Sequence, residues 1–159
     1  MALKQTFGFL GAGRMATALA GGMVKASLIK SRQLVASDLV PAAAKAFAKT
    51  TGGKALKGNA EVVRKANVIV IAVKPHQVLE MLGELSEKVT AKHLFISIAT
   101  GVTIAQLENA LGGRKARVIR VMPNTPALVG EGAAGFACGK HATAADAKMA
   151  ARMLGGGGL

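Results

Sequence analysis

Small residues with a regular spacing lie near the start of the chain and are suited to binding a diphosphate. Gly11, Gly13 and Ala16 form a Gly-x-Gly-x-x-Ala pattern between an apolar segment and a segment with helical spacing. In such a turn the first glycine permits a sharp bend, the second lets a pyrophosphate approach the backbone, and the alanine permits close packing. Free N–H groups and the dipole of the following helix favour phosphate. The pattern predicts a dinucleotide site, and the alternative is a purely structural turn.

Asp38 follows the second apolar segment and lies 25 positions after Gly13. A carboxylate at the end of the second strand accepts hydrogen bonds from the adenosine ribose and favours NADH, whereas an arginine favours the 2′-phosphate of NADPH. Like charges about 4 Å apart cost about 1 kcal/mol in water and about 4 kcal/mol at an effective dielectric of 20. We therefore expect tighter binding of NADH than of NADPH. The alternative is an ordinary turn residue at a strand end.

Two further segments carry polar side chains beside prolines. Lys74 precedes Pro75 and is either a phosphate contact or a solvated lysine. Asn124 and Thr125 lie within the string MPNTP, whose prolines fix the backbone. These two side chains can form hydrogen bonds beside a bound nicotinamide, or they can belong to a rigid turn.

The histidines and the cysteine have no spacing that suits a metal site. We expect His76, His93 and His141 on the surface or in loops, and we predict no metal. Cys138 lies in an apolar stretch and is expected to be a small core residue rather than a nucleophile. No catalytic residue is assigned from the sequence.

The elements that would position these residues alternate between strand and helix. Residues 68–73, VIVIAV, are apolar on both faces, which is typical of a central parallel strand covered from both sides. The other predicted strands are 6–10, 33–37, 54–57, 94–99, 117–122 and 132–138. The predicted helices are 14–26, 41–49, a short helix capped by Asn59, 77–89, 104–111 and 144–154. We predict an α/β fold, a Rossmann-type doubly wound, mostly parallel sheet in a single domain.

Composition narrows the class of protein. A length of 159 residues fits one domain. Tryptophan and tyrosine are absent, and five phenylalanines are too few for a platform that stacks nucleic-acid bases. The net charge of +13 favours an anionic partner. No apolar run approaches the roughly 18 residues of a membrane span, and one cysteine forms no intrachain disulfide, so we expect a cytoplasmic protein without membrane or nucleic-acid partners.

Four strings along the chain together resemble pyrroline-5-carboxylate reductase, the last enzyme of proline biosynthesis. They are GFLGAGRMATAL, AVKPHQV, SIATGVTIAQLENAL and RVIRVMPNTPALVGEG, in that order. The resemblance implies cofactor contacts at Leu10, Gly11, Ala12, Gly13, Arg14, Met15, Asp38, Asn59, Ala72, Val73, Lys74, Pro75, Ile98, Ala99 and Thr100. It places Asn124 and Thr125 on the nicotinamide and substrate side. These positions follow strands, where an open α/β sheet binds its ligand.

The resemblance also implies the reaction and the partners. A reduced nicotinamide, NADPH or NADH, would deliver a hydride to the C=N carbon of 1-pyrroline-5-carboxylate and yield L-proline. Family members that use NADPH often have serine or another neutral residue where this chain has Asp38. Full-length members form homo-oligomers through an all-helical domain that also holds the substrate carboxylate. We expect residues 1–154 to be the NAD(P)-binding domain and 155–159 a glycine-rich tail, with the helical domain absent.

Three functions therefore stay open. The first is a pyrroline-5-carboxylate reductase represented by its cofactor-binding domain. The second is a stand-alone NAD(P)-binding module without activity. The third is a basic nucleic-acid-binding protein, which no recognised motif supports.

Overall fold

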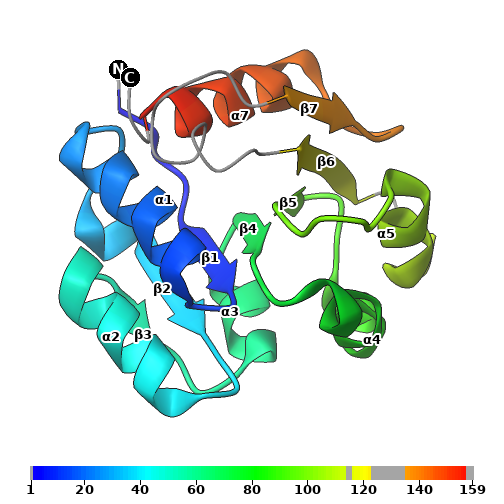
Figure 1. Cartoon of the computed structure of the whole chain (residues 1–159). Coiled ribbons are helices and arrows are strands. Elements are labelled where there is room, and N and C mark those ends of the chain that lie inside the picture. The colour runs from blue at the N-terminus through cyan, green and yellow to red at the C-terminus, as the bar shows by residue number, and fades with distance from the viewer. Residues whose placement is uncertain (1, 114–115, 123–134, 157–159) are drawn as a thin grey trace.

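Seven strands form one sheet whose faces are both covered by helices (Figure 1). The computed structural model describes residues 2–113, 116–122 and 135–156. The strand order is β3-β2-β1-β4-β5-β6-β7, with β1 to β6 parallel and β7 antiparallel to β6. The strands are β1 (Phe7–Leu10), β2 (Leu34–Ser37), β3 (Lys54–Ala55), β4 (Val68–Ile71), β5 (Leu94–Ser97), β6 (Arg117–Met122) and β7 (Gly135–Cys138). This is the order of a Rossmann sheet, as predicted.

The helices connect successive strands and lie where the sequence predicts them, with shifted ends. They are α1 (Arg14–Lys25), α2 (Pro41–Thr51), α3 (Asn59–Lys65), α4 (Pro75–Leu85), α5 (Ile104–Ala110) and α7 (Ala144–Gly156), with 3-10 turns at Ser31–Gln33 and Ser86–Lys88. Two ends differ for a physical reason. Pro75 begins α4 two residues before the predicted start, because proline suits the first helical position. Asn59 is the first residue of α3 rather than its cap, and Gly58 takes the cap position.

Two layers of apolar side chains hold the helices to the sheet. On one face Phe9, Val70 and Ile96 belong to a core that also includes Leu19 of α1 and Phe47 of α2. The other face carries a second core, which the alternate strand residues form with α3, α4 and α5. Burial on both faces explains the apolar string at β4 and confirms the prediction of a central parallel strand. None of the helices in the described residues has the length and apolar character that crossing a membrane requires.

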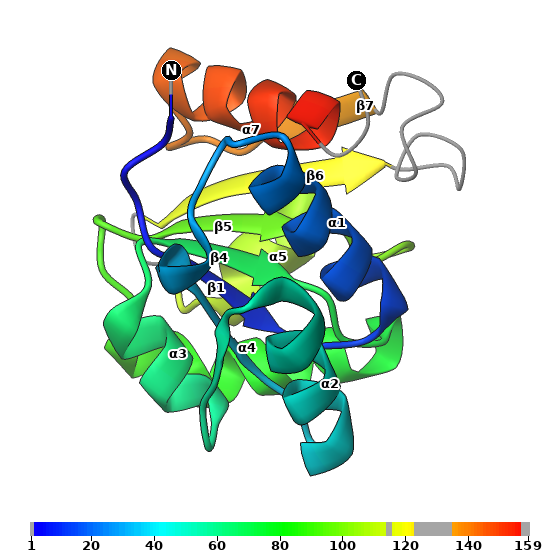
Figure 2. The same cartoon turned by 90° about the vertical axis from the view of Figure 1, so that its left-hand side faces the viewer.

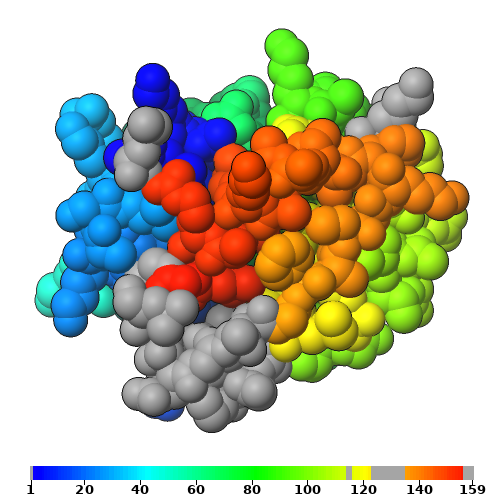
Figure 3. Space-filling view, turned by 90° about the horizontal axis from the view of Figure 1, so that it is seen from above, coloured from blue at the N-terminus to red at the C-terminus, as the bar shows by residue number. Residues whose placement is uncertain are grey.

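The helix α7 packs against α1 and joins the core on one face of the sheet. Figure 2 shows α7 above α1, next to β6 and β7, and Figure 3 shows α7 and β7 covering the molecule from above. A guanidinium nitrogen of Arg117 lies 2.7 Å from Oδ1 of Asp146, whose side chain is only 4% exposed. Asp146 also accepts a bond from the N–H of Thr143, and Arg117 donates to the carbonyl of Lys92. This buried ion pair joins α7 to the start of β6.

The structure agrees with one expectation about a single residue and corrects another. His93 lies in the loop before β5, as expected, and its side chain is buried there. Its Nδ1 accepts from the N–H of Thr90 at 3.0 Å, so its Nε2 donates to the carbonyl of Val63 at 2.8 Å. His93 therefore joins β5 to α3. Cys138 is exposed at the end of the edge strand β7 and is not a core residue.

Candidate dinucleotide-binding cleft

The turn between β1 and α1 lies at the carboxyl edge of the sheet, where the strand order reverses. Chain connections from β1 lead through β2 to β3 on one side, and β4 begins the other half of the sheet. Ligands of open α/β sheets bind in the crevice at this point. We call residues 11–15 of this turn the phosphate loop.

The two glycines of the phosphate loop are required for different reasons. Gly11 has φ of +98°, and a Cβ there would lie 2.7 Å from the carbonyl carbon and oxygen of Ala72. Only glycine fits this sharp turn beside the backbone of the neighbouring strand. At Gly13, by contrast, φ is −78° and a Cβ would meet no atom within 4 Å. The space in front of Gly13 is free, as binding of a pyrophosphate against the backbone requires.

The backbone N–H groups of the loop fall into two sets. Gly11 donates to the carbonyl of Ser37 at 2.9 Å, and Ala12 donates to Oδ2 of Asp38 at 2.8 Å. The first bond of α1 runs from Thr17 to Gly13, so among the described residues the N–H groups of residues 13–16 have no acceptor. Four free donors at the positive end of a 12-residue helix are suited to bind phosphate oxygens.

Asp38 joins the loop to the turn after β2. Its Oδ1 accepts from the N–H of Val40 at 2.8 Å, which is the turn bond that the alternative interpretation expected. Its Oδ2 accepts from Ala12, which the sequence did not predict. Each carboxylate oxygen keeps a second lone pair, so both remain able to accept from another donor.

Three adjoining cavities follow the carboxyl ends of the strands and form one cleft. The first, of 420 Å³, is lined by residues 13–16, 72–75 and 98–100. The second, of 250 Å³, shares residues 72–74 with the first and extends to residues 38–40. The third, of 300 Å³, shares Asp38 and Leu39 with the second and reaches Asn59 and α4. An elongated cleft that passes the phosphate loop has the shape that a dinucleotide needs.

Most of the predicted contact residues lie along this cleft. They are Gly11, Gly13, Arg14, Met15, Asp38, Asn59, Ala72, Val73, Lys74, Pro75, Ile98, Ala99 and Thr100. The side chain of Leu10 is instead fully buried in the core. Asn59 lies in the third cavity, where its Oδ1 accepts from the hydroxyl of Ser37 at 2.6 Å. The predicted residues Asn124 and Thr125 lie outside the described residues.

The cleft also contains residues that sequence reasoning missed. Leu39 and Val40 are apolar, yet 81% and 58% exposed, and both line the cavities beside Asp38. Gln77, Glu80 and Glu84 line the third cavity from one side of α4. Gln77 and Glu80 are three residues apart, and Glu80 and Glu84 are four apart. This spacing is the signal that could have placed them on one face of the helix that Pro75 begins.

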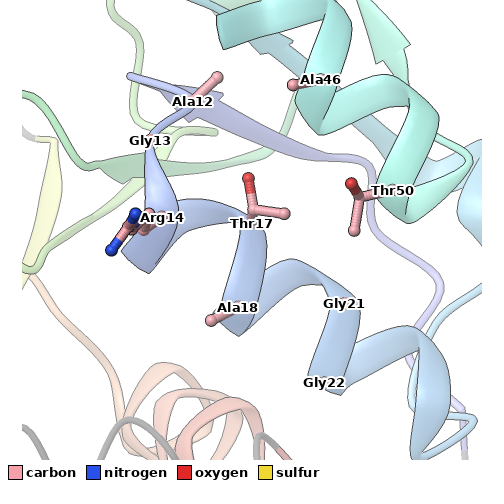
Figure 4. A pocket seen from close by; sticks show the side chains of 9 residues that line it. All are labelled: Ala12, Gly13, Arg14, Thr17, Ala18, Gly21, Gly22, Ala46 and Thr50. Carbon is pink, nitrogen blue, oxygen red and sulfur yellow. The ribbon is translucent and has the colours of Figure 1, made fainter.

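A cavity larger than any of the three in the cleft lies elsewhere, between α1 and α2 (Figure 4). It has a volume of 620 Å³ and is lined mainly by small residues of the two helices, with Thr17 and Thr50 on opposite sides. It meets the cleft only at the phosphate loop, through Gly13 and Arg14, and Ala12 lines it rather than the cleft. In Figure 4 the side chain of Arg14 points away from α2. Volume alone therefore does not identify the phosphate-binding side of the loop.

The family model described as NADP oxidoreductase, coenzyme F420-dependent, matches residues 6–101. This match runs from β1 through the turn after β5 and includes the whole phosphate loop. The chain belongs to this oxidoreductase family. Membership agrees with the free donors and the open space in front of Gly13, because both suit a dinucleotide diphosphate.

Relatives of the chain include pyrroline-5-carboxylate reductases. The protein of that name from Methanosarcina acetivorans is 40% identical over 147 residues, which are 92% of this chain and 54% of the relative. A pyrroline-5-carboxylate reductase structure from Coxiella burnetii matches with a TM-score of 0.89 and 29% identity, over 98% of this chain and 57% of that one. A Plasmodium falciparum pyrroline carboxylate reductase with NADP bound matches with a TM-score of 0.85 and 31% identity, over 100% of this chain and 57% of that one. The chain thus spans about half the length of these relatives.

Proposed function

We propose that this chain is the cofactor-binding half of a pyrroline-5-carboxylate reductase, which reduces 1-pyrroline-5-carboxylate to L-proline with NAD(P)H. The observation that carries the proposal is the 40% identity to the Methanosarcina acetivorans reductase over 92% of this chain. That alignment covers more of this chain than the family model does, which matches residues 6–101. We assign cofactor binding to residues 1–154, outside the glycine-rich residues 155–159.

The residues of the cleft fit a dinucleotide in an extended pose. The free N–H groups of residues 13–16 and the cations Arg14 and Lys74 would hold the pyrophosphate. Asp38 would accept from the adenosine ribose, and the exposed Leu39 would cover a face of the base. The first cavity would take the nicotinamide, with Asn124 and Thr125 proposed beside it.

The chain's own contribution is to orient the cofactor and to keep water away from it. Met15, Ile98 and Ala99 give the first cavity apolar walls, which exclude water from one face of a ring placed there. When bound, the reduced nicotinamide supplies a hydride to the electrophilic C=N carbon of the substrate. We assign no catalytic residue to this half. The substrate carboxylate and the contacts of a homo-oligomer are proposed to lie in the second half found in the relatives.

We further propose that the cofactor is NADH rather than NADPH. Asp38, Glu80 and Glu84 line the third cavity, and neither lysine nor arginine is among its described lining residues. A 2′-phosphate would therefore enter a locally acidic site although the whole chain carries a charge of +13, because distant lysines are screened beyond about 8 to 10 Å. The description of the family and the NADP-bound relative favour NADPH, and a titration of both reduced dinucleotides decides between the two.

We also propose a cytoplasmic location. The free and exposed Cys138 suits a reducing compartment.

A transplant tests the proposed function. The corresponding first half of the Methanosarcina acetivorans reductase is replaced by this chain, and oxidation of NADH is followed with and without 1-pyrroline-5-carboxylate. We expect substrate-dependent oxidation by the chimera, and its loss when the same chimera carries Gly13→Val, because the added side chain fills the space in front of the loop.

A folded chimera that binds NADH but never oxidises it with this substrate would contradict the proposal. That result would favour a stand-alone dinucleotide-binding module. Turnover by the unmodified chain alone would show that this half suffices.

A further inference from the structure

We propose that Asp38 is also a positioning residue for the phosphate loop, in addition to its proposed contact with the adenosine ribose. Its carboxylate holds the N–H of Ala12 and so sets the direction of the four free N–H groups that follow. This inference rests on the proposed binding of a dinucleotide. It predicts that Asp38 affects phosphate binding even for a ligand that has no adenosine.

Two neighbouring residues of β2 and its turn hold the first half of the loop. The carbonyl of Ser37 accepts from Gly11 at 2.9 Å, and Oδ2 of Asp38 accepts from Ala12 at 2.8 Å. The second oxygen of Asp38 is fixed by the N–H of Val40 at 2.8 Å. The N–H of Val40 thus fixes the carboxylate of Asp38, and the carboxylate then fixes the loop through Ala12, which lies 26 residues earlier in the chain.

The position of the Ala12 bond explains why it matters for the donors beyond it. Gly11 and Gly13 flank Ala12, and glycine permits many backbone conformations. Among the described residues, no other side chain accepts from the loop's N–H groups. Without the carboxylate, the partly buried N–H of Ala12 loses its acceptor and the peptide between the glycines gains freedom to rotate. The free N–H groups then no longer point in one direction, and phosphate affinity falls.

The same geometry limits a common way of changing cofactor preference. Replacing Asp38 by serine removes the charge that opposes a 2′-phosphate, but it also removes the two oxygens that hold Val40 and Ala12. The variant is therefore expected to gain less NADPH affinity than the charge alone implies.

A ligand that cannot reach Asp38 separates the two roles. Reduced nicotinamide mononucleotide has one phosphate for the loop and no adenosine ribose. Nicotinamide emission measures the dissociation constants of the reduced mononucleotide and of NADH for this chain and for its variants Asp38→Ala and Asp38→Asn. Glu87→Gln is the matched control, because it removes an exposed carboxylate in the 3-10 turn after α4 that lines none of the three cavities.

We expect Asp38→Ala to weaken the mononucleotide by about tenfold, as loss of a charge-assisted hydrogen bond implies, and to weaken NADH further. Asp38→Asn keeps one acceptor oxygen, so it should fall between the wild type and the alanine variant. Amide hydrogen exchange of Ala12 in the ligand-free chain should be faster in Asp38→Ala and unchanged in the control. The rescue by asparagine distinguishes positioning of the loop from a general loss of stability.

The opposite pattern overturns the inference. If Asp38→Ala weakens NADH but leaves both mononucleotide binding and the exchange of Ala12 unchanged, the carboxylate acts through the ribose alone. If the wild-type chain binds neither reduced nucleotide, the proposed function fails, while the exchange of Ala12 still tests the bond to Asp38.

Discussion

Gly11 and Gly13 are two residues apart, yet the structure gives them separable roles. Gly11 has a positive φ, and a Cβ there would collide with the backbone of Ala72, so its requirement comes from the fold. Gly13 faces open space with an ordinary φ, so its requirement comes only from what approaches it. A sequence pattern places both glycines correctly but does not say which one the fold needs.

Alanine substitutions should therefore have different effects at the two positions. Gly11→Ala should lower the free energy of unfolding by about 2 kcal/mol and weaken NADH, because its Cβ collides with backbone that cannot move away. Gly13→Ala should change the free energy of unfolding by less than about 1 kcal/mol, the scale of a helix-cap substitution, yet weaken NADH at least tenfold. Urea unfolding and nicotinamide emission measure the two effects. Equal losses of stability in both variants would contradict the distinction.

Asp38 predicts the choice between the two reduced dinucleotides. With a carboxylate near the 2′ position, the dissociation constant for NADPH should exceed that for NADH by about tenfold or more. Asp38→Ser should bring the ratio close to one or reverse it, chiefly because NADH binds more weakly. A wild-type preference for NADPH in the same titration would refute this view of Asp38.

At the scale of elements, the turn that follows α1 contains an unusual residue. Ser27 has φ of +59°, the left-handed conformation that glycine normally supplies at a helix end. The N–H of Leu28 donates to the carbonyl of Met23, and the N–H of Ser27 donates to that of Val24. This is the bond pattern of a Schellman motif, closed by two buried apolar residues. The site stores strain that a serine does not relieve.

Ser27→Gly should therefore stabilise the chain by about 0.5 to 1 kcal/mol, which corresponds to a rise in melting temperature of about 2 °C for a chain of this size. Thermal unfolding monitored by circular dichroism measures the change. Ser86→Gly is the control, because φ there is −54° and glycine should only destabilise. A rise in both variants would mean that the backbone conformation at Ser27 is not the cause.

Elements were predictable where one physical signal dominates. The apolar string of β4 and the proline at the start of α2 placed those elements from sequence. The burial of His93 could not be predicted, because it depends on a carbonyl in α3, 30 residues away. Cys138 could not be placed either, because an apolar string does not show that β7 is an edge strand. Such errors arise where long-range packing decides the outcome.

The whole molecule combines a strongly basic chain with a cleft whose ends differ in charge. Arg14 and Lys74 line the part beside the phosphate loop, whereas Asp38, Glu80 and Glu84 line the far end. Composition predicted an anionic partner but not this division, because it depends on which helical face α4 turns to the cleft. The predicted sites at Asn124 and Thr125 stay predictions.

The attachment of α7 to β6 depends on one partly buried ion pair. Asp146→Ala leaves the guanidinium of Arg117 partly buried and unpaired, so it should cost about 3 kcal/mol of unfolding free energy. Glu61→Gln is the control, since it breaks a more exposed pair with Lys65 and should cost less than about 0.5 kcal/mol. Urea unfolding compares them, and similar small losses would show that α7 is held by its apolar contacts alone.

The central claim is that this chain binds a reduced dinucleotide along the carboxyl edge of its sheet. The most direct test is a titration of NADH with the purified chain, followed by nicotinamide emission. Because the chain has no tryptophan or tyrosine, energy transfer from these residues does not disturb the signal. The account predicts saturable binding at one site, tighter for NADH than for NADPH and weakened at least tenfold by Gly13→Ala. Binding that does not saturate, or that Gly13→Ala leaves unchanged, would contradict it.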